Sequence, residues 1–389
     1  MRFSFRLAEL LKYSPDPRRR PGVIKAICDY TGLDRHQVAA LLRNEVKHIP
    51  LDTLSRLCDF LVEHGHAAPD QLPGALFAVE AENFWEMLAR RKRLELCVGV
   101  RREAHDSSDG AWVVASDSIL LGELLNGVST LGGTAQLRQS QQLKWEQRIP
   151  HPEHLKQSLV WAPGEGLSEQ VRDRANEVYD EFTKSDSDKA LVALGSVKSN
   201  PVVELVLSSA FRCEPFKSQD DVTVPGHRAC PFYVRYRDFD PHPESCCAGT
   251  RLSGWEATEE SGIYYEDASG AWNLCPCDAL RDAAFVFYLH RESQGWLEMA
   301  LGGFSGRATR ILAKTLSMRA EDFWPPVYEE FGIQVGAYIV QYTYAPQEER
   351  NRNVLRSDVV TSTKVIPLDR EVLRHRLVPS QVKAAQKSK

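Results

Sequence analysis

The chain has 389 residues, more than one ordinary hydrophobic core organises, so its length favours several domains of about 100 to 200 residues each. Hydrophobic residues make up 43% of the chain and charged residues 26%, which is typical of a soluble globular protein. No apolar run approaches the roughly 20 residues that span a bilayer, and the start of the sequence lacks a signal peptide. We therefore expect a cytoplasmic protein without a membrane partner.

The net charge of −5 hides an asymmetry between the first 66 residues and the rest. Residues 1–66 carry 11 Lys and Arg against 8 Asp and Glu, whereas the remaining residues carry 37 against 45. Lys and Arg supply much of the affinity of proteins for DNA because they neutralise phosphates. The N-terminal region has the sign of charge expected of a DNA-facing domain, and the remainder is expected to face something else.

Apolar residues at helical spacing predict four helices in residues 1–66, which we assign to a compact all-α domain. The helices are expected over 3–14, 23–30, 35–44 and 51–64. Residues 67–93 are predicted to form a connector with a helix over 83–93 that ends in a run of basic residues. This run suits a solvated helix end better than a DNA contact, because cations stabilise the carboxyl end of a helix.

From residue 94 onward, apolar runs typical of strands alternate with helical patterns. Strands are expected over 94–100, 111–115, 189–194, 283–289, 297–301 and 334–344, and helices over 118–125, 167–184, 201–211 and 307–318. Strands followed by helices favour an α/β domain with a mainly parallel, Rossmann-like sheet, which we assign to 94–346. Residues 347–389 have many charges and little periodicity, so they are predicted to form a charged tail with disordered last residues.

A glycine turn joins the second and third predicted helices. Gly32 lies between them, where a tight turn requires a positive φ. Asp34 precedes the third helix and Gln37 follows three residues later, a capping-box spacing that fixes where this helix starts. The small Cys28 lies four residues before Gly32, and apolar residues lie six and nine residues after it. Two steeply crossing helices need such residues at these positions.

The segment Ile27 to Val38, ICDYTGLDRHQV, resembles the helix-turn-helix of the Cro and phage-repressor (XRE) family. The resemblance covers roughly residues 5–65 and implies that the helix after the turn lies in the major groove of double-stranded DNA. The chain departs from the family at Cys28, where alanine is usual, and in a longer, arginine-rich connection between the first two helices.

The resemblance also implies which side chains contact DNA. Base contacts are expected from Arg35, His36, Gln37, Ala40, Arg43 and Asn44. Arginine suits guanine and glutamine suits adenine. Phosphate contacts are expected from Arg18, Arg19, Arg20 and Lys47. A helical docking domain that binds no DNA is the alternative, but the turn spacing, the cap, the polar set and the local positive charge together favour DNA.

Two predicted strand-to-helix junctions are candidates for a ligand site. Each combines glycine, hydroxyl and basic residues, and free backbone N–H groups at a helix start can bind an anion. The candidate residues are Gly195, Ser196, Lys198, Ser199, Asn200 and Glu204 at the first junction, and Gly302, Gly303, Ser305, Gly306, Arg307 and Thr309 at the second.

In open α/β sheets, loops of this kind can meet over one pocket outside the carboxyl ends of the strands. A small anionic or nucleotide-like effector is therefore expected at the two junctions. Neither junction matches the Walker phosphate loop or the dinucleotide fingerprint, and two ordinary tight connections remain the alternative.

The nine cysteines are interpreted as thiols, because their number is odd and no export signal precedes them. Five of the cysteines form a cluster in the sequence, with two histidines nearby: Cys230, Cys246, Cys247, Cys275 and Cys277, with His227 and His242. The cluster lacks the two-residue spacing of paired zinc ligands, so no metal or cofactor is predicted. Residues 230–240 alternate large and charged residues, which favours an amphipathic strand over an aromatic and arginine surface for single-stranded nucleic acid.

The sequence thus predicts a multidomain, sequence-specific transcriptional regulator whose α/β domain senses a ligand or mediates homodimerisation. One alternative is an enzyme that acts on a nucleotide or glycosidic bond through Asn200 or Glu204, although the sequence contains no Gly-x-Ser-x-Gly, His-Glu-x-x-His or identifiable carboxylate pair. The other is a non-catalytic scaffold, which predicts no effect of a ligand on DNA affinity.

Overall fold

The structure is a computed structural model that describes residues 3–11, 13, 22–43, 45–46, 48–79, 81–102, 111–132, 152–163, 168–184, 188–216, 229–237, 260–291, 295–330, 333–346 and 359–377. The chain divides into two compact units. The N-terminal unit comprises Met1–Glu82, His290–Leu297 and Glu329–Gln334, and the sheet unit comprises Asn83–Leu289, Glu298–Tyr328 and Val335–Lys389. None of the described helices is long and apolar enough to cross a membrane.

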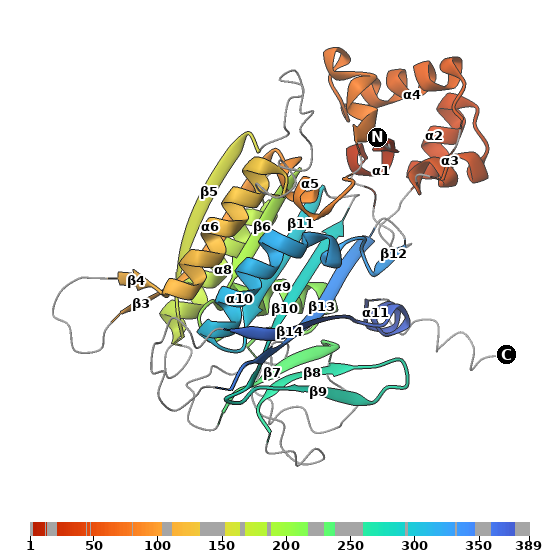
Figure 1. Ribbon diagram of the computed structural model, residues 1–389. Coiled ribbons are helices and arrows are strands. Elements are labelled where there is room, and N and C mark those ends of the chain that lie inside the picture. The colour runs from red at the N-terminus through yellow and green to blue at the C-terminus, as the bar shows by residue number, and fades with distance from the viewer. Residues whose placement is uncertain are drawn as a thin grey trace, which may run out of the picture. The chain divides into compact units, whose positions relative to one another are not determined.

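Helices and a small antiparallel ribbon make up the N-terminal unit between Phe3 and Val79. The helices are α1 (Leu7–Leu10), α2 (Val23–Thr31), α3 (Arg35–Leu42) and α4 (Leu51–Glu63) (Figure 1). The 3-10 turns η2 (Pro69–Gln71) and η3 (Gly74–Leu76) lead into β2 (Phe77–Val79), which pairs antiparallel with β1 (Phe3–Phe5).

The helix expected over 3–14 is wrong at its start, where the structure has β1 and then only the short helix α1. The sequence Phe3-Ser4-Phe5 also has the period of two that is typical of a strand. The ring of Phe5 packs edge to face on Phe77 of β2, with 5.5 Å between the ring centroids. Pairing with a segment far away in the sequence therefore overrides the local helical spacing.

A single hydrophobic core joins the helices of the N-terminal unit. Its buried residues include Ile27 of α2, Val38 and Leu41 of α3, and Leu57 and Phe60 of α4. Because each of these helices contributes buried side chains to one cluster, the packing fixes how α2 crosses α3.

The sheet unit is built on a nine-stranded sheet with the order β12-β13-β10-β11-β6-β3-β4, in which β14 also pairs with β13 and β5 also pairs with β3. The strands are β3 (Arg93–Arg102), β4 (Ala111–Val113), β5 (His154–Trp161), β6 (Lys189–Leu194), β10 (Arg281–Arg291), β11 (Trp296–Gly303), β12 (Tyr328–Glu330), β13 (Ile333–Tyr344) and β14 (Val360–Pro367).

This sheet is mixed, so the mainly parallel, Rossmann-like sheet expected from the sequence is present only in part. Strand β3 pairs in parallel with β5 and β6, whereas the pairs β3–β4 and β13–β14 are antiparallel. Residues 292–295 alone separate β10 from its neighbour β11, too few for the crossover that parallel neighbours need.

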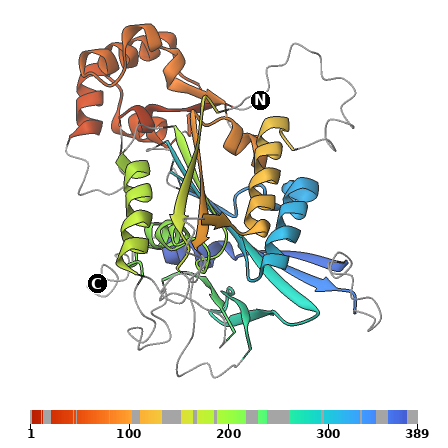
Figure 2. The same cartoon turned by 90° about the vertical axis from the view of Figure 1, so that its left-hand side faces the viewer.

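Helices cover both faces of the sheet (Figures 1 and 2). Helices α6 (Ala115–Thr130) and α10 (Gly306–Arg319) lie side by side on one face, and α8 (Glu169–Lys184) and α9 (Val202–Phe211) lie on the other. The unit also contains α5 (Phe84–Ala89), η7 (Ala320–Phe323) and α11 (Arg370–Leu377). Every residue of β6 is buried, which explains why this strand is one continuous apolar run apart from Lys189.

The basic run after α5 pairs with acidic side chains. The helix expected over 83–93 ends at Ala89, and β3 begins at Arg93. Arg90 Nε lies 3.1 Å from Glu86 Oε2, and Arg91 Nη1 lies 3.5 Å from Asp188 Oδ1. These ion pairs hold the two arginines within the sheet unit, where both are partly buried, and Lys92 is exposed.

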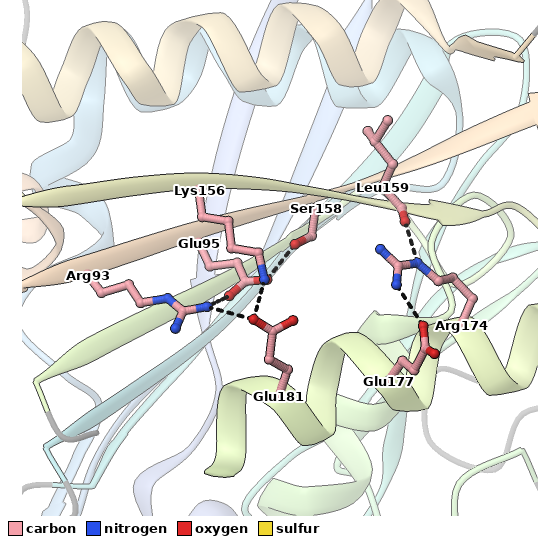
Figure 3. A network of polar contacts seen from close by, with 8 residues as sticks. All are labelled: Arg93, Glu95, Lys156, Ser158, Leu159, Arg174, Glu177 and Glu181. Atoms are coloured by element: carbon pink, nitrogen blue, oxygen red, sulfur yellow. Dashed lines mark hydrogen bonds and ion pairs between the residues drawn. The ribbon is translucent and has the colours of Figure 1, made fainter. Parts of the chain in front are cut away.

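A buried ionic network fixes the strand β5 to β3 and α8 (Figure 3). Glu95 of β3 is 0% exposed and accepts hydrogen bonds from Arg93 Nη2 at 2.9 Å and from Ser158 Oγ at 2.5 Å. Lys156 Nζ lies 3.3 Å from Glu95 Oε1 and donates to Glu181 Oε1 at 2.8 Å. The pairing with Lys156 lowers the pKa of the Glu181 carboxyl.

A second, antiparallel sheet has the order β7-β8-β9, with β7 (Phe232–Arg235), β8 (Gly262–Glu266) and β9 (Trp272–Pro276). The segment expected to form an amphipathic strand supplies β7, but all four residues of β7 are buried. Tyr233 stacks on Tyr264 with 4.9 Å between the ring centroids. The rings of β7 are therefore core side chains and do not offer a stacking surface for nucleotide bases.

The segment expected to be a charged tail contributes β14 and α11 to the sheet unit. Strand β14 extends the sheet by pairing antiparallel with β13, and Leu373 and Leu377 of α11 are buried. The strand sequence VTSTKVIP contains four consecutive polar residues and no fully buried position, so its hydrophobic periodicity is weak. Residues 347–358 and 378–389 lie outside the described residues.

Candidate functional site

The turn between α2 and α3 has the geometry expected from its glycine. Gly32 adopts φ 72°, in the left-handed region, and its N–H donates to Cys28 O at 2.9 Å. Thr31 Oγ1 donates to Ile27 O at 2.6 Å and accepts from Leu33 N–H at 3.3 Å. The prediction of a positive φ at Gly32 is confirmed, and the turn ends α2 with its last backbone groups paired.

Arg56 of α4 holds this turn from the opposite side. Its Nη1 donates to Thr31 O at 2.9 Å, and its Nε donates to Asp52 O at 3.3 Å. The guanidinium therefore pairs with a carbonyl at the carboxyl end of α2, where a cation is stabilising. Sequence reasoning missed Arg56, because its partner is 25 residues away and no local pattern marks it.

The capping box predicted at the start of α3 is confirmed. Asp34 Oδ1 accepts from Gln37 N–H at 2.8 Å, and Gln37 Oε1 accepts from Asp34 N–H at 3.2 Å. The two bonds fix the first turn of α3. They also engage the amide oxygen of Gln37, which bidentate recognition of adenine would require. The side-chain N–H groups of Gln37 are directed away from this bond and can donate to an external acceptor.

Helix α3 divides into a buried and an exposed side. Val38 and Leu41 are buried in the core, as the spacing from Gly32 predicts. Arg35 and His36 are exposed on the first turn, next to Gln37, and Ala40 is half-buried further along. Since helix packing immobilises the buried side, the exposed first turn is held in a fixed orientation.

Arg43 ends α3 and is paired with an acidic neighbour. Its Nε donates to Glu45 Oε2 at 2.9 Å, and both side chains are more than half exposed. An exposed pair of this kind contributes little to stability, so phosphate oxygens can compete for the guanidinium. The remaining predicted DNA contacts, Arg18, Arg19, Arg20, Asn44 and Lys47, lie outside the described residues.

Comparison with known proteins identifies the same segment. Residues 23–62, which span α2, α3 and most of α4, match the family of Cro/C1-type HTH DNA-binding domains. The chain therefore carries an XRE-like helix-turn-helix, and this domain supports a DNA-binding regulator. No curated protein matches the chain, and no solved structure matches it either.

The two glycine junctions of the sheet unit lie against each other. They lie at the carboxyl ends of β6 and β11, which are neighbours in the sheet. Gly195 N–H donates to Leu301 O at 2.8 Å, and a Cβ on Gly302 would lie 2.2 Å from Gly195 O. Any side chain at Gly302 would separate the loops, so this glycine permits their close approach.

Asn200 ties the first junction to two strands. Its Nδ2 donates to Cys97 O at 2.9 Å and to Leu194 O at 3.1 Å, and its Oδ1 accepts from Val202 N–H at 3.0 Å. Glu204 is completely buried, and its Oε1 accepts from Phe216 N–H at 3.3 Å. These bonds give both side chains a structural task, and the geometry does not support them as the catalytic pair of an enzyme.

Arg307 of the second junction is engaged within the loop. Its guanidinium lies 3.6 Å from the centroid of the Tyr344 ring, and its Nη2 donates to Ala279 O at 3.3 Å. Its Nε lies 3.7 Å from Asp282 Oδ2. These contacts direct Arg307 toward the turn before β10, and the expected role in holding a ligand anion has no support from its position.

The hydroxyl residues of the second junction cap α10. Ser305 Oγ accepts from Ala308 N–H at 3.2 Å and donates to Asp282 Oδ2. Thr309 Oγ1 donates to Ser305 O at 3.1 Å and accepts from Gly303 N–H at 3.2 Å. The loop is thus held by its own side chains.

Lys198, the basic residue of the first junction, contacts an aromatic ring. Lys198 Nζ lies 4.9 Å from the centroid of the Tyr236 ring, a cation–π contact.

The described cysteines are thiols. Cys275 and Cys277 are buried, and burial raises the pKa of the Cys275 thiol to about 11. Within the part of the chain that the structure describes, no group of three or more His, Cys, Asp or Glu side chains is placed to hold a metal ion. Cys246, Cys247, His227 and His242 lie outside that part.

Proposed function

We propose that the protein is a sequence-specific transcriptional regulator that reads base edges in the major groove with the first turn of α3. The observation that carries the proposal is the exposure of Arg35 and His36 on a capped helix whose opposite side is locked in the core. The match of residues 23–62 to Cro/C1-type HTH DNA-binding domains supports it.

Within this proposal the residues of the first turn have different tasks. Arg35 and His36 donate to base edges, and a guanidinium suits the paired acceptors of guanine. Gln37 is a positioning residue, because its amide oxygen closes the capping box and orients the turn. Arg43 exchanges Glu45 for a backbone phosphate when DNA binds.

The proposal includes the sheet unit as the part that senses an effector or mediates homodimerisation. A symmetric dimer places two copies of α3 about 34 Å apart, one turn of DNA, and predicts an inverted repeat as the target. If the dimer has two arrangements that differ in DNA affinity, a ligand that binds one of them more tightly would shift the protein toward that arrangement. The ratio of the ligand's affinities for the two arrangements limits how much it can change DNA affinity.

The test is selection of bound sequences from a random DNA library with the purified full-length protein, followed by affinity measurements on the enriched site. The wild type is expected to enrich an inverted repeat. Arg35→Ala and His36→Ala are each expected to cost about 1 to 3 kcal/mol of binding free energy and to relax the preference at single base positions. Arg174→Ala, an exposed arginine of α8, is the matched control and should bind as the wild type does.

Gln37→Ala separates positioning from base reading. Loss of the capping box is expected to weaken binding to all sequences by a similar factor and to cost about 1 kcal/mol of stability. A change of preference at one base position would instead make Gln37 a base-reading residue. Absence of any enriched sequence with folded protein would contradict the proposal.

A further inference from the structure

At β6, the helices that follow neighbouring strands of the sheet lie on opposite faces of it. In the sheet order β6 lies between β11 and β3. The chain continues from β11 into α10 and from the β3–β4 pair into α6 on one face, whereas β6 continues into α9 on the other face (Figures 1 and 2). In α/β sheets, ligands bind outside the carboxyl ends of strands where the connections leave to opposite faces. The end of β6 is such a point.

An unpaired buried carboxylate oxygen is directed to this point. Asp117, in the first turn of α6, is 3% exposed, and its Oδ1 accepts from Ser116 Oγ at 3.2 Å. Its Oδ2 has no hydrogen-bond partner among the described residues. A Cβ at Gly195, the residue after β6, would lie 3.0 Å from this oxygen and 2.2 Å from Ser199 Oγ. Ser199 Oγ lies on the same side of Gly195 and donates to Ser196 O at 3.2 Å.

The missing partner is a hydrogen-bond donor. Leaving a buried polar atom unpaired costs about 1 to 3 kcal/mol, and more for a charged group. Burial accordingly raises the pKa of Asp117, although the hydroxyls of Ser116 and Ser199 and the guanidinium of Arg101 lower it in part. Protein sequences keep such local costs mainly at functional sites. A ligand hydroxyl group would remove the cost by donating to Oδ2.

The same place favours an anionic group. Helices α6 and α10, of 16 and 14 residues, begin close together, since a Cβ at Gly306 would lie 3.3 Å from Ser116 Oγ. The amino ends of helices carry partial positive charge, which favours phosphate, and at α10 Ser305 Oγ already accepts from Ala308 N–H. An acceptor for a hydroxyl group therefore lies beside two positive helix ends.

We propose that the end of β6 binds a phosphate ester with free hydroxyl groups, a nucleotide or a sugar phosphate, and that Asp117 Oδ2 accepts a hydrogen bond from one of those hydroxyl groups. The phosphate lies at the starts of α6 and α10. This proposal rests on the effector-sensing part of the proposed function and is independent of DNA binding by α3.

The test is calorimetric titration of the full-length protein with ADP, ribose 5-phosphate and inorganic phosphate. The wild type is expected to bind at least one of the two esters more tightly than inorganic phosphate. Preference for ADP identifies a nucleotide site, and preference for ribose 5-phosphate identifies a sugar phosphate site. Asp117→Asn is expected to weaken binding of the preferred ester by about tenfold or more and not to weaken binding of inorganic phosphate, because the variant removes a negative charge beside the proposed phosphate position.

Asp173→Asn on the exposed side of α8 is the control and should bind as the wild type does. Thermal unfolding of the ligand-free variants shows whether Asp117 has a purely structural role, which predicts a lower Tm for Asp117→Asn. No binding of either ester by the wild type at about 1 mM, or equal ester affinity of wild type and Asp117→Asn, would overturn the proposal. The DNA selection described above has a separate readout, so failure of either proposal is recognised independently.

Discussion

Two buried carboxylates of the sheet unit, Glu95 and Asp117, differ in how they are paired. Glu95 lies near the start of β3, where Arg93, Ser158 and Lys156 surround its two oxygens (Figure 3). Asp117 lies beside the end of β6, and one of its oxygens has no partner among the residues that the structure describes. Burial is nearly complete at both positions.

The comparison shows that burial by itself does not identify the role of a carboxylate. A buried charge with a complete set of partners contributes to holding its strands together, and removing it leaves its partners unpaired. A buried charge with an incomplete set lowers stability, so its presence calls for another explanation, such as a ligand. Each prediction below changes a carboxylate with a different set of partners.

The largest effect is expected for Glu95→Ala. The change removes the acceptor shared by Arg93, Lys156 and Ser158, and we expect the free energy of unfolding to fall by about 3 kcal/mol. Urea unfolding of the full-length protein measures this loss. Glu177→Ala, which breaks the exposed ion pair with Arg174, should change stability by less than about 1 kcal/mol. A loss of similar size in the two variants would show that the network does not stabilise the sheet.

Asp282→Ala tests whether the hydrogen-bond partners of a buried carboxylate or its position in the sheet determine its effect on stability. Asp282 is buried near the second glycine junction, but it accepts from Ala283 N–H at 3.0 Å and from Ser305 Oγ, and it pairs with Arg307. Removing it leaves these donors without their acceptor, so we expect a loss of about 2 kcal/mol in urea unfolding. An unchanged stability would mean that location in the sheet, rather than pairing, distinguishes Asp117 from Glu95.

Asp117→Asn is expected to change stability in the opposite direction. Above the folded-state pKa of Asp117 the ligand-free variant should be more stable than the wild type by about 1 kcal/mol, because the unpaired charge is gone. Burial raises the folded-state pKa of Asp117 above its ordinary value of 3.8. The stability that protonated Asp117 contributes is therefore complete below pH 3.8 and is lost as the pH rises through the folded-state pKa.

The advantage of the Asn variant should follow this window. It should be absent in acid and reach its full size once Asp117 is ionised in the folded protein. Urea unfolding of both proteins across this pH range measures the difference. A variant that is less stable than the wild type near neutrality would show that Asp117 has a partner that its structural role requires.

The smallest effect is expected for Asp267→Asn in the turn between β8 and β9. Asp267 Oδ1 accepts from Ser269 N–H at 2.9 Å and from Ala271 N–H at 3.1 Å, and Asn273 Nδ2 donates to Oδ2 at 2.8 Å. Hydrogen bonds from the Ser269 and Asn273 side chains lower the pKa of Asp267 to about 2. Its contribution to stability is present above pH 3.8 and is lost as the pH falls toward 2.

The Asn variant should therefore differ from the wild type above this window and converge with it in acid. Since Asp267 is only partly buried, the difference should be the smallest of the series. Acid titration followed by circular dichroism at fixed denaturant measures it. Equal curves for both proteins would show that a partly buried carboxylate with several partners adds nothing to stability.

The helix-turn-helix could be predicted from the sequence because its rules are local. Gly32, Asp34 and Gln37 lie within six residues of one another, and each acts through backbone geometry of the same turn. Arg56 could not be predicted in the same way, because it reaches the turn from another helix. The strand β1 was missed for a similar reason, since its partner β2 lies far along the chain.

The site at the end of β6 could be predicted only in part. The glycines and hydroxyl residues marked the two junctions, and the structure brings those junctions together. Asp117 gave no signal, because an acid in the first turn of a helix is ordinary for electrostatic reasons. Its role depends on an absent partner, which only three-dimensional packing defines. The same holds for Asn200, whose bond to Cys97 O joins residues 103 positions apart.

Affinity for DNA is the measurement that decides whether α3 reads a base sequence. We would measure binding of the wild type and of the Arg35→Ala protein to the enriched sequence and to a scrambled sequence of equal length and composition. We expect strong preference of the wild type for the enriched sequence and loss of most of that preference in the variant. Equal affinity for both sequences, or a variant that retains the full preference, would contradict the assignment of α3 as the helix that reads DNA.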